Sequence, residues 1–271
     1  MRAARQCGQV LLRTFDRPPA NRMGRRALHE YTLATREFLL NTLKDATRSA
    51  FPDHNVTQDP TELEEHSSTT WLLQPLDGET NFLRSLQSYC AVIGIFEGQV
   101  LQHSIVYDYF QDEEYYASRD ETAMVNQNRL RVSGIEALSD AVIACSMPNQ
   151  PSSIDNRVLA QLDSILSHSN CNLRVNGSLG MDIAQVARGR LDALIAPWNP
   201  SDVVLQSTSI LITESGGYIK GVKIPKDTNS LVVIANPKLS LTISDLISTQ
   251  ADTNEQAESP QPAVNSKQTG N

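Results

Sequence analysis

Apolar residues recur with helical spacing in two segments near the start of the chain. In residues 2–15 small and apolar residues repeat every three or four positions, which predicts an amphipathic helix with one buried face. A similar pattern covers residues 30–50, and two prolines at positions 18 and 19 separate the segments. The pattern therefore predicts two helices at the beginning of the fold.

Shorter apolar runs follow, and they are typical of strands. Residues 90–119 hold three such runs, and Glu97–Gly98 predicts a hairpin turn between the first two. The run Trp71 to Leu73 indicates a buried strand. Further strands are expected at 126–134, 139–146 and 231–236, and further helices at 154–168 and 203–213.

The length of 271 residues allows one large domain. We expect a single domain over residues 1–247, made of two apposed halves at about 1–135 and 136–247. Residues 248–271 are almost free of apolar side chains, which predicts a disordered polar tail.

Bulk composition narrows the function classes. A net charge of −8 argues against a general nucleic-acid-binding surface. No run approaches 18 apolar residues, so no transmembrane helix and no membrane partner are expected. Four widely spaced cysteines without CxxC spacing are typical of reduced thiols in a cytoplasmic protein.

Arginine is concentrated at the start of the chain, with seven among the first 26 residues. Such a segment is compatible with a transit peptide. The same residues also form one amphipathic helix face, which favours a structural helix.

The string WLLQPLDGETNF, Trp71 to Phe82, carries the candidate chemistry. A buried strand, a tight turn at Asp77–Gly78 and a polar segment that opens a helix follow one another. This succession directs backbone N–H groups and the positive end of a helix dipole to one point, which suits a phosphate group.

This string resembles the signature of the inositol monophosphatase superfamily, W-I/V-I-D-P-I/L-D-G-T-x-N-F/Y. A second block, Arg174 to Ala196, and the ESGG turn at Glu214 resemble further parts of the family pattern. The resemblance implies a layered α/β/α/β/α fold, often homodimeric. It also implies a Mg²⁺-dependent, Li⁺-sensitive phosphatase of small phosphorylated polyols.

The resemblance implies a set of magnesium ligands, and this chain departs from it. Gln74 stands at the position of a metal-binding aspartate, and a neutral amide is a weak Mg²⁺ ligand. The remaining candidate ligands are Asp59, the Leu76 carbonyl, Asp77 and a displaced Asp202, while Val203–Val204 occupy the position of the family's last aspartate.

At the catalytic and substrate positions, too, some residues match the family pattern and others depart from it. Asp77 and Glu79 are the candidate catalytic residues, although Glu79 replaces a family threonine, and Gly78, Glu79 and Ser178 are the candidate substrate contacts. Arg36 replaces an acid, and a cation there opposes metal binding if it points inward. Without a metal, we expect Asp77 to cap the helix that follows it, and Glu79 to be a helix N-terminal carboxylate facing solvent.

Two functions follow from this comparison. The first is a catalytically impaired family member that acts as a binding or regulatory protein, like SuhB-type proteins in transcription antitermination, with a protein of the transcription machinery as its partner. The second is a phosphatase of inositol monophosphate or a related sugar phosphate, which uses Mg²⁺ at the reduced site. A homodimer is expected in either case.

Overall fold

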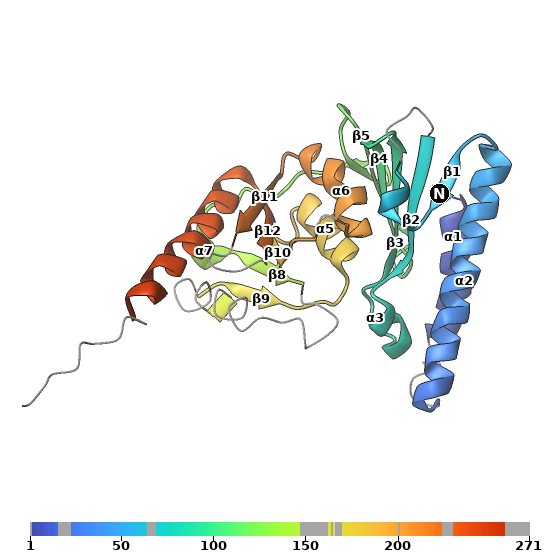
Figure 1. Cartoon of the computed structure of the whole chain (residues 1–271), viewed down its shortest axis with the longest axis horizontal. Helices are drawn as coiled ribbons and strands as arrows, with labels where there is room; N and C mark the ends of the chain where they lie inside the picture. Colours follow the sequence, from blue (N-terminus) through green and yellow to red (C-terminus); the bar gives the residue numbers. More distant parts are fainter. Residues whose placement is uncertain are drawn as a thin grey trace, which may run out of the picture.

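A computed structural model of the chain describes residues 2–15, 23–63, 69–146, 162–163, 165, 170–199, 201–223 and 230–257. These residues form two β-sheets and three helix layers, stacked in the order helix, sheet, helix, sheet, helix (Figure 1). The layered α/β/α/β/α architecture implied by the resemblance is therefore confirmed.

Helices α1 (Arg2–Phe15) and α2 (Arg25–Ala50) form the first layer. Ala4, Cys7 and Leu11 of α1 are buried with Leu39 of α2 in one apolar cluster that also contains residues of the first sheet. Both predicted helices are confirmed, and α2 begins five residues earlier than residue 30. The arginine-rich α1 is thus part of the packed fold.

The first sheet has the strand order β1-β2-β3-β4-β5-β6-β7. Strand β1 runs parallel to β2, and all later neighbours are antiparallel, as the predicted meander requires. The predicted hairpin joins β3 to β4, with Gly98 in the turn at a φ of 59°. The bounds are β1 (Asn55–Thr57), β2 (Thr69–Asp77), β3 (Cys90–Glu97), β4 (Val100–Asp108), β5 (Glu113–Ser118), β6 (Met124–Val125) and β7 (Asn128–Arg129).

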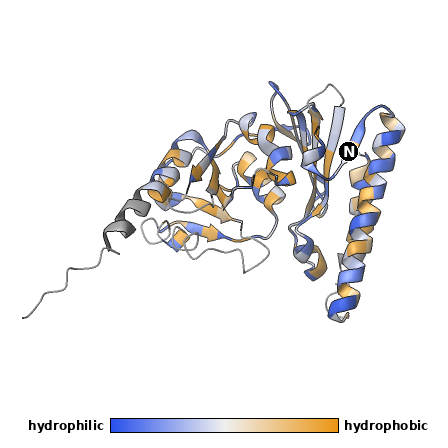
Figure 2. Cartoon of the chain, viewed as in Figure 1, coloured by the Kyte–Doolittle hydropathy of each residue, from blue (hydrophilic) through white to orange (hydrophobic). Residues whose placement is uncertain are grey.

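Helices α5 (Leu179–Ala187) and α6 (Val203–Thr213) lie between the sheets, where hydrophobic residues are dense (Figure 2). The second sheet has the order β11-β12-β10-β8-β9, and α7 (Pro237–Ala257) covers its outer face (Figure 1). The bounds are β8 (Val142–Cys145), β9 (Asn172–Arg174), β10 (Ala193–Pro197), β11 (Tyr218–Lys223) and β12 (Ser230–Ala235). The described part of the chain also contains the short helices η2 (Pro60–Glu62), α3 (Glu79–Arg84) and η3 (Leu138–Asp140).

The predicted strand over 126–134 is confirmed only at Asn128–Arg129, which form β7. Asn126 has a positive φ of 52° and turns the chain between the two-residue strands β6 and β7. Beyond them, the N–H of Val132 bonds to the Ser215 carbonyl outside any strand ladder. The segment therefore holds a turn at Asn126 and the two-residue strand β7, and residues 130–134 belong to no strand.

The later helices and the C-terminal tail agree with the expectations only in part. Helix 203–213 matches α6 at both ends, and α7 continues through Ala257, so the helix passes residue 248, where we expected the tail to begin. The expected helix 154–168 and residues 258–271 lie largely outside the described residues. Among the described helices, none has the length and apolar character needed to cross a membrane.

Candidate functional site

Strand β2 becomes irregular just before the signature aspartate. Its register with β3 shifts between Gln74 and Asp77, and Pro75, which has no N–H to donate, lies in that interval. The buried Tyr109 hydroxyl donates a hydrogen bond of 2.7 Å to the Pro75 carbonyl. This irregularity places the Gln74 and Asp77 side chains and the Leu76 carbonyl together at the end of the strand.

Gly78 makes the turn from β2 into α3. Its φ of 79° is in the left-handed region, and a Cβ atom there would lie 2.5 Å from the Ser88 carbonyl oxygen. Only glycine fits this backbone without displacing its neighbour. The turn leaves the Glu79 side chain at the first position of α3, next to Asp77.

A cleft of about 810 Å³ opens at this turn. Its walls come from α2, from the end of β2 with the start of α3, and from the segment between β10 and α6. Six candidate site residues line it: Gln74, Leu76, Asp77, Gly78, Glu79 and Asp202. Asp59 and Ser178 are not among its lining residues.

Asp77 connects the end of β2 to the start of α5. Its Oδ2 accepts hydrogen bonds of 2.6 Å from the Ser178 hydroxyl and 2.8 Å from the Gly180 N–H in the first turn of α5. The expectation that Asp77 caps the helix directly after it is wrong, because α3 has no side-chain cap. Asp77 instead stabilises the N-terminus of α5, about a hundred residues later in the sequence.

Burial raises the pKa of Asp77, and the negative charge of Asp202 raises it further. The hydrogen bonds from Ser178 and Gly180 act in the opposite direction and favour the carboxylate. The net rise means that the Asp77 carboxylate is held against a desolvation cost, with the chain's own donors as its partners.

Ser178 lies behind Asp77. It is buried, its hydroxyl donates to Asp77, and it also accepts from the Met181 N–H as the N-cap of α5. Asp59 has a similar local task, because its Oδ1 accepts from the N–H and the hydroxyl of Thr61 at the start of η2. Both side chains therefore have structural partners, and neither is among the residues that line the cleft.

The Gln74 amide takes the place of the missing aspartate. Its Nε2 donates a hydrogen bond of 3.3 Å to the Leu76 carbonyl oxygen. That carbonyl is the backbone ligand that the family resemblance assigns to a metal. The substitution therefore supplies an N–H donor where the family signature has an anionic oxygen.

Arg36 points into the cleft from α2 and lines it together with Gln74 and Glu79. A guanidinium nitrogen of Arg36 lies 3.9 Å from a Glu79 carboxylate oxygen. Both side chains are partly exposed, so the pair contributes little to stability. It does place a positive charge in the cleft. The expectation of a helix N-terminal carboxylate at Glu79 is confirmed, because Glu79 is the first residue of α3 and its side chain is partly exposed.

Asp202 reaches the same cleft as Asp77. It is the N-cap of α6, and its Oδ1 accepts hydrogen bonds of 2.9 Å from the Val204 N–H and 3.0 Å from the Leu205 N–H. Val203 and Val204 also line the cleft, so an apolar surface stands beside Asp202. The displaced aspartate is thus near the site with one oxygen committed to the helix.

These residues do not fit the two or three magnesium ions of the family. Mg²⁺ needs nearly octahedral oxygen ligands. Here the Leu76 carbonyl, one Asp77 oxygen and one Asp202 oxygen already accept from protein donors, and Arg36 adds a cation. Within the described part of the chain, no three acidic, histidine or cysteine side chains gather to hold a metal ion.

Two features near Asp77 were not found in the sequence. The buried thiol of Cys90 lies 3.9 Å from Asp77 Oδ2, because Cys90 is the register partner of Asp77 on β3. Asp182, on α5, is 1% exposed and accepts a hydrogen bond of 2.6 Å from the Asn176 amide. Burial raises the pKa of Asp182 to about 7, and the charge of Asp77 contributes to the rise. Cys90 could have been found from the sequence only with the β2–β3 register, which pairs it with Asp77.

The fold and the signature turn define the class of this protein. The model of the inositol monophosphatase family matches residues 1–252, and the chain belongs to this family.

Its curated relatives carry a more particular name. The chain is 28% identical to the Nus factor SuhB of Pseudomonas aeruginosa, over 81% of this chain and 82% of that protein. It is 27% identical to the Nus factor SuhB of Buchnera aphidicola, over 88% and 91% of the two chains.

Solved structures share the fold. The suhB extragenic suppressor protein of Bartonella henselae superposes with a TM-score of 0.74 at 21% identity, over 91% of this chain and 95% of that one. The inositol monophosphatase of Anabaena superposes with a TM-score of 0.70 at 23% identity, over 92% and 93%.

Proposed function

We propose that this chain is a SuhB-like binding protein of the transcription machinery with an impaired phosphatase site. One observation carries the second part of the proposal: the Gln74 amide bonds to the Leu76 carbonyl at 3.3 Å, where the family signature supplies an aspartate. The names of the SuhB relatives support the first part.

The cleft supports this function because its polar groups have protein partners. Asp77 accepts from α5, Asp202 accepts from the start of α6, and Arg36 lies beside Glu79. Such a cleft is preorganised without a metal, and its residues hold the two halves together. The chain has the family fold, while Gln74 and Arg36 stand where the family has acidic residues.

A second candidate is a magnesium-dependent phosphatase of inositol monophosphate or a related sugar phosphate. The observation in its favour is that Asp202 lines the same cleft as Asp77 and Leu76. In that case the free oxygens of Asp77 and Asp202 would hold a single ion, which would neutralise charge on a bound phosphoryl group.

Two assays on one preparation test the proposal. The first measures phosphate release from inositol 1-phosphate with Mg²⁺, with and without Li⁺, beside the Anabaena inositol monophosphatase as an active control. The second measures binding to purified Nus factors by size-exclusion chromatography with light scattering, in Mg²⁺ and in EDTA, which also gives the oligomeric state. We expect no Li⁺-sensitive turnover and a complex that persists in EDTA.

Li⁺-sensitive turnover that Asp77→Asn abolishes would replace the proposal with the phosphatase. Absence of both turnover and a Nus-factor complex, in folded protein, would refute the transcription partner.

A further inference from the structure

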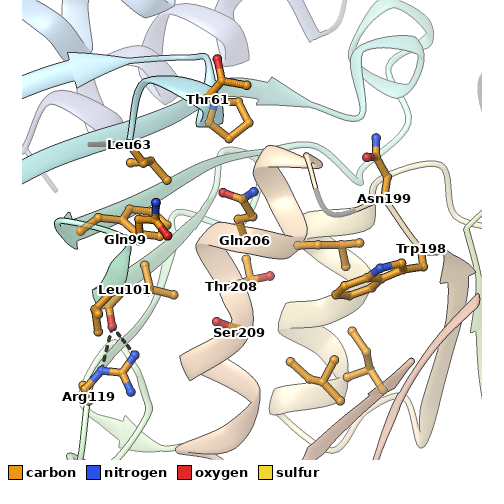
Figure 3. Close-up of a pocket in the computed structure, with 16 residues that line it drawn as sticks. Thr61, Leu63, Gln99, Leu101, Arg119, Trp198, Asn199, Gln206, Thr208 and Ser209 are labelled. Carbon is orange, nitrogen blue, oxygen red and sulfur yellow. Dashed lines mark hydrogen bonds between the residues drawn. The ribbon is translucent and has the colours of Figure 1, made fainter. Parts of the chain in front are cut away.

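A second cavity, of about 680 Å³, lies over α6 (Figure 3). Its walls come from the β3–β4 hairpin, from η2, from α6 and from the residues that follow β10. Asn199 is the only described residue that lines both this cavity and the cleft beside Asp77. We call this cavity the α6 groove.

One end of the α6 groove is aromatic and apolar. Trp198 lies there with an exposed fraction of 43%, and the lining of the groove also includes the aliphatic residues Leu205, Ile219 and Ile234. Figure 3 shows the indole ring lying along this end of the groove. A large exposed ring above an aliphatic surface is a typical contact for the apolar part of a ligand.

The other end of the α6 groove is polar and carries a positive charge. The guanidinium of Arg119 donates two hydrogen bonds, of 2.9 and 2.7 Å, to the Leu101 carbonyl, which fixes its orientation (Figure 3). Its third nitrogen has no hydrogen-bond partner among the described residues. The side chains of Gln99 and Ser209, which line the same end, likewise make no hydrogen bond with another described residue.

The charge of the α6 groove differs from that of the whole protein. The chain has a net charge of −8, yet the described lining contains one guanidinium and no acidic side chain. An anion therefore meets a fixed positive charge at Arg119 without an opposing carboxylate in the groove. Trp198 and Arg119 lie on opposite sides of the α6 ribbon, so one ligand needs an elongated shape to contact both (Figure 3).

We infer that the α6 groove binds a small amphipathic anion. Its carboxylate, or a similar acid group, pairs with Arg119 and accepts from Ser209 or Gln99, and its ring-sized apolar body lies on Trp198. The volume is within the range of roughly 300–1,000 Å³ that is common for small-molecule sites. This site does not depend on the proposed function, because no side chain that engages Asp77 belongs to it.

Trp198 provides the readout, because the chain has two tryptophans and Trp71→Phe leaves Trp198 as the only one. The probe is 8-anilinonaphthalene-1-sulfonate, an aromatic sulfonate that accepts energy from tryptophan. We expect saturable 1:1 binding with quenching of Trp198. We also expect 3-phenylpropionate to displace the probe about tenfold better than neutral 3-phenylpropionamide, because a charge-assisted hydrogen bond is about twice as strong as a neutral one.

Two variants and a control locate the site. Arg119→Gln keeps a donor for the Leu101 carbonyl but removes the charge, and we expect about tenfold weaker probe binding; Trp198→Ala should weaken it similarly, measured by probe fluorescence. Tyr116→Ala, in a different apolar cavity on the first sheet, should leave binding unchanged. Circular dichroism checks that each variant is folded.

Non-saturable binding, or equal displacement by the acid and the amide, would overturn the inference even if a variant did not fold. Loss of binding in Tyr116→Ala alone would also overturn it, because the probe would then occupy the other cavity.

Discussion

Gln74 and Leu76, two residues apart on β2, are joined by a hydrogen bond from the Gln74 side-chain amide to the Leu76 carbonyl. One substitution thereby has two effects in this fold. It removes a carboxylate from the signature, and it occupies a backbone oxygen that the family uses as a ligand. The further exchange of an acid for Arg36 adds a cation to the same cleft.

Restoring the acid should create magnesium affinity. In Gln74→Asp combined with Arg36→Ala, a new carboxylate lies near Asp77 and Asp202 and the guanidinium is gone. We expect the apoprotein to lose about 1–3 kcal/mol of stability, because the Leu76 carbonyl loses its donor and like charges accumulate. Mg²⁺ should recover part of this loss, measured as a rise in melting temperature with increasing Mg²⁺.

The matched control for that variant is Gln74→Leu with Arg36→Ala, which loses the same hydrogen bond without adding a carboxylate. An equal response of both variants to Mg²⁺ would show that the residue at position 74 does not limit metal binding.

Removing the Asp77 side chain should destabilise the fold in the absence of any metal. Asp77→Ala leaves the Gly180 N–H and the Ser178 hydroxyl without their acceptor, and we expect a loss of about 2–4 kcal/mol from two buried donors. Asp77→Asn retains one acceptor oxygen, so its loss should be about 1 kcal/mol or less. Urea unfolding in EDTA measures both values. A larger effect of Asn than of Ala would contradict this structural role.

Stability should fall as pH rises from about 4 to above 7. Asp182 has its pKa raised to about 7 in the fold, chiefly by burial, while in the unfolded chain the group ionises near its ordinary pKa of 3.8. The folded protein therefore binds more protons in this interval, so stability is complete below the unfolded pKa and declines as pH passes the folded pKa. The raised pKa of Asp77 acts in the same direction.

The variant Asp182→Asn tests the origin of this dependence. We expect it to flatten the decline between pH 5 and 8, of which Asp182 contributes at most about 3 kcal/mol. Urea unfolding at several pH values is the measurement. An unchanged slope in Asp182→Asn would assign the dependence to other groups, with Asp77→Asn as the next variant to compare.

Arg188 makes a second connection, between α5 and the first sheet, and mutation can measure its strength. Arg188, at the end of α5, donates hydrogen bonds of 2.5 Å to Glu113 and 2.9 Å to the Tyr115 hydroxyl on β5. We expect Arg188→Met to cost about 1–3 kcal/mol, because a partly buried, charge-assisted pair is lost. A double-mutant cycle with Glu113→Gln should give a coupling near 1 kcal/mol. A coupling of zero would mean that the two side chains act independently.

The regular elements could be predicted from the sequence because their patterns are local. Helical spacing located α1, α2 and α6, and alternating runs with a glycine turn located β3 and β4. The strand expected over 126–134 forms only at Asn128–Arg129. Asn126, with its positive φ, makes the turn before this strand, and residues 130–134 belong to no strand.

The partners of the site residues could not be predicted, because they depend on contacts between distant segments. The sequence placed Asp77 before a helix but did not show that its carboxylate would stabilise α5, which begins at residue 179. Likewise, Arg36 and Glu79 were each identified, while their proximity depends on how α2 packs beside the start of α3.

The bond between Asp77 and α5 has a consequence for how the family signature is interpreted. A residue with such a structural role contributes to folding whether or not the protein turns over a substrate. Asp77 and Gly78 are residues of this kind, because the Asp77 carboxylate accepts a hydrogen bond from α5 and Gly78 makes a turn that only glycine fits. The presence of Asp77 and Gly78 therefore does not by itself indicate phosphatase activity. Gln74 and Arg36, which line the cleft, bear more directly on metal binding.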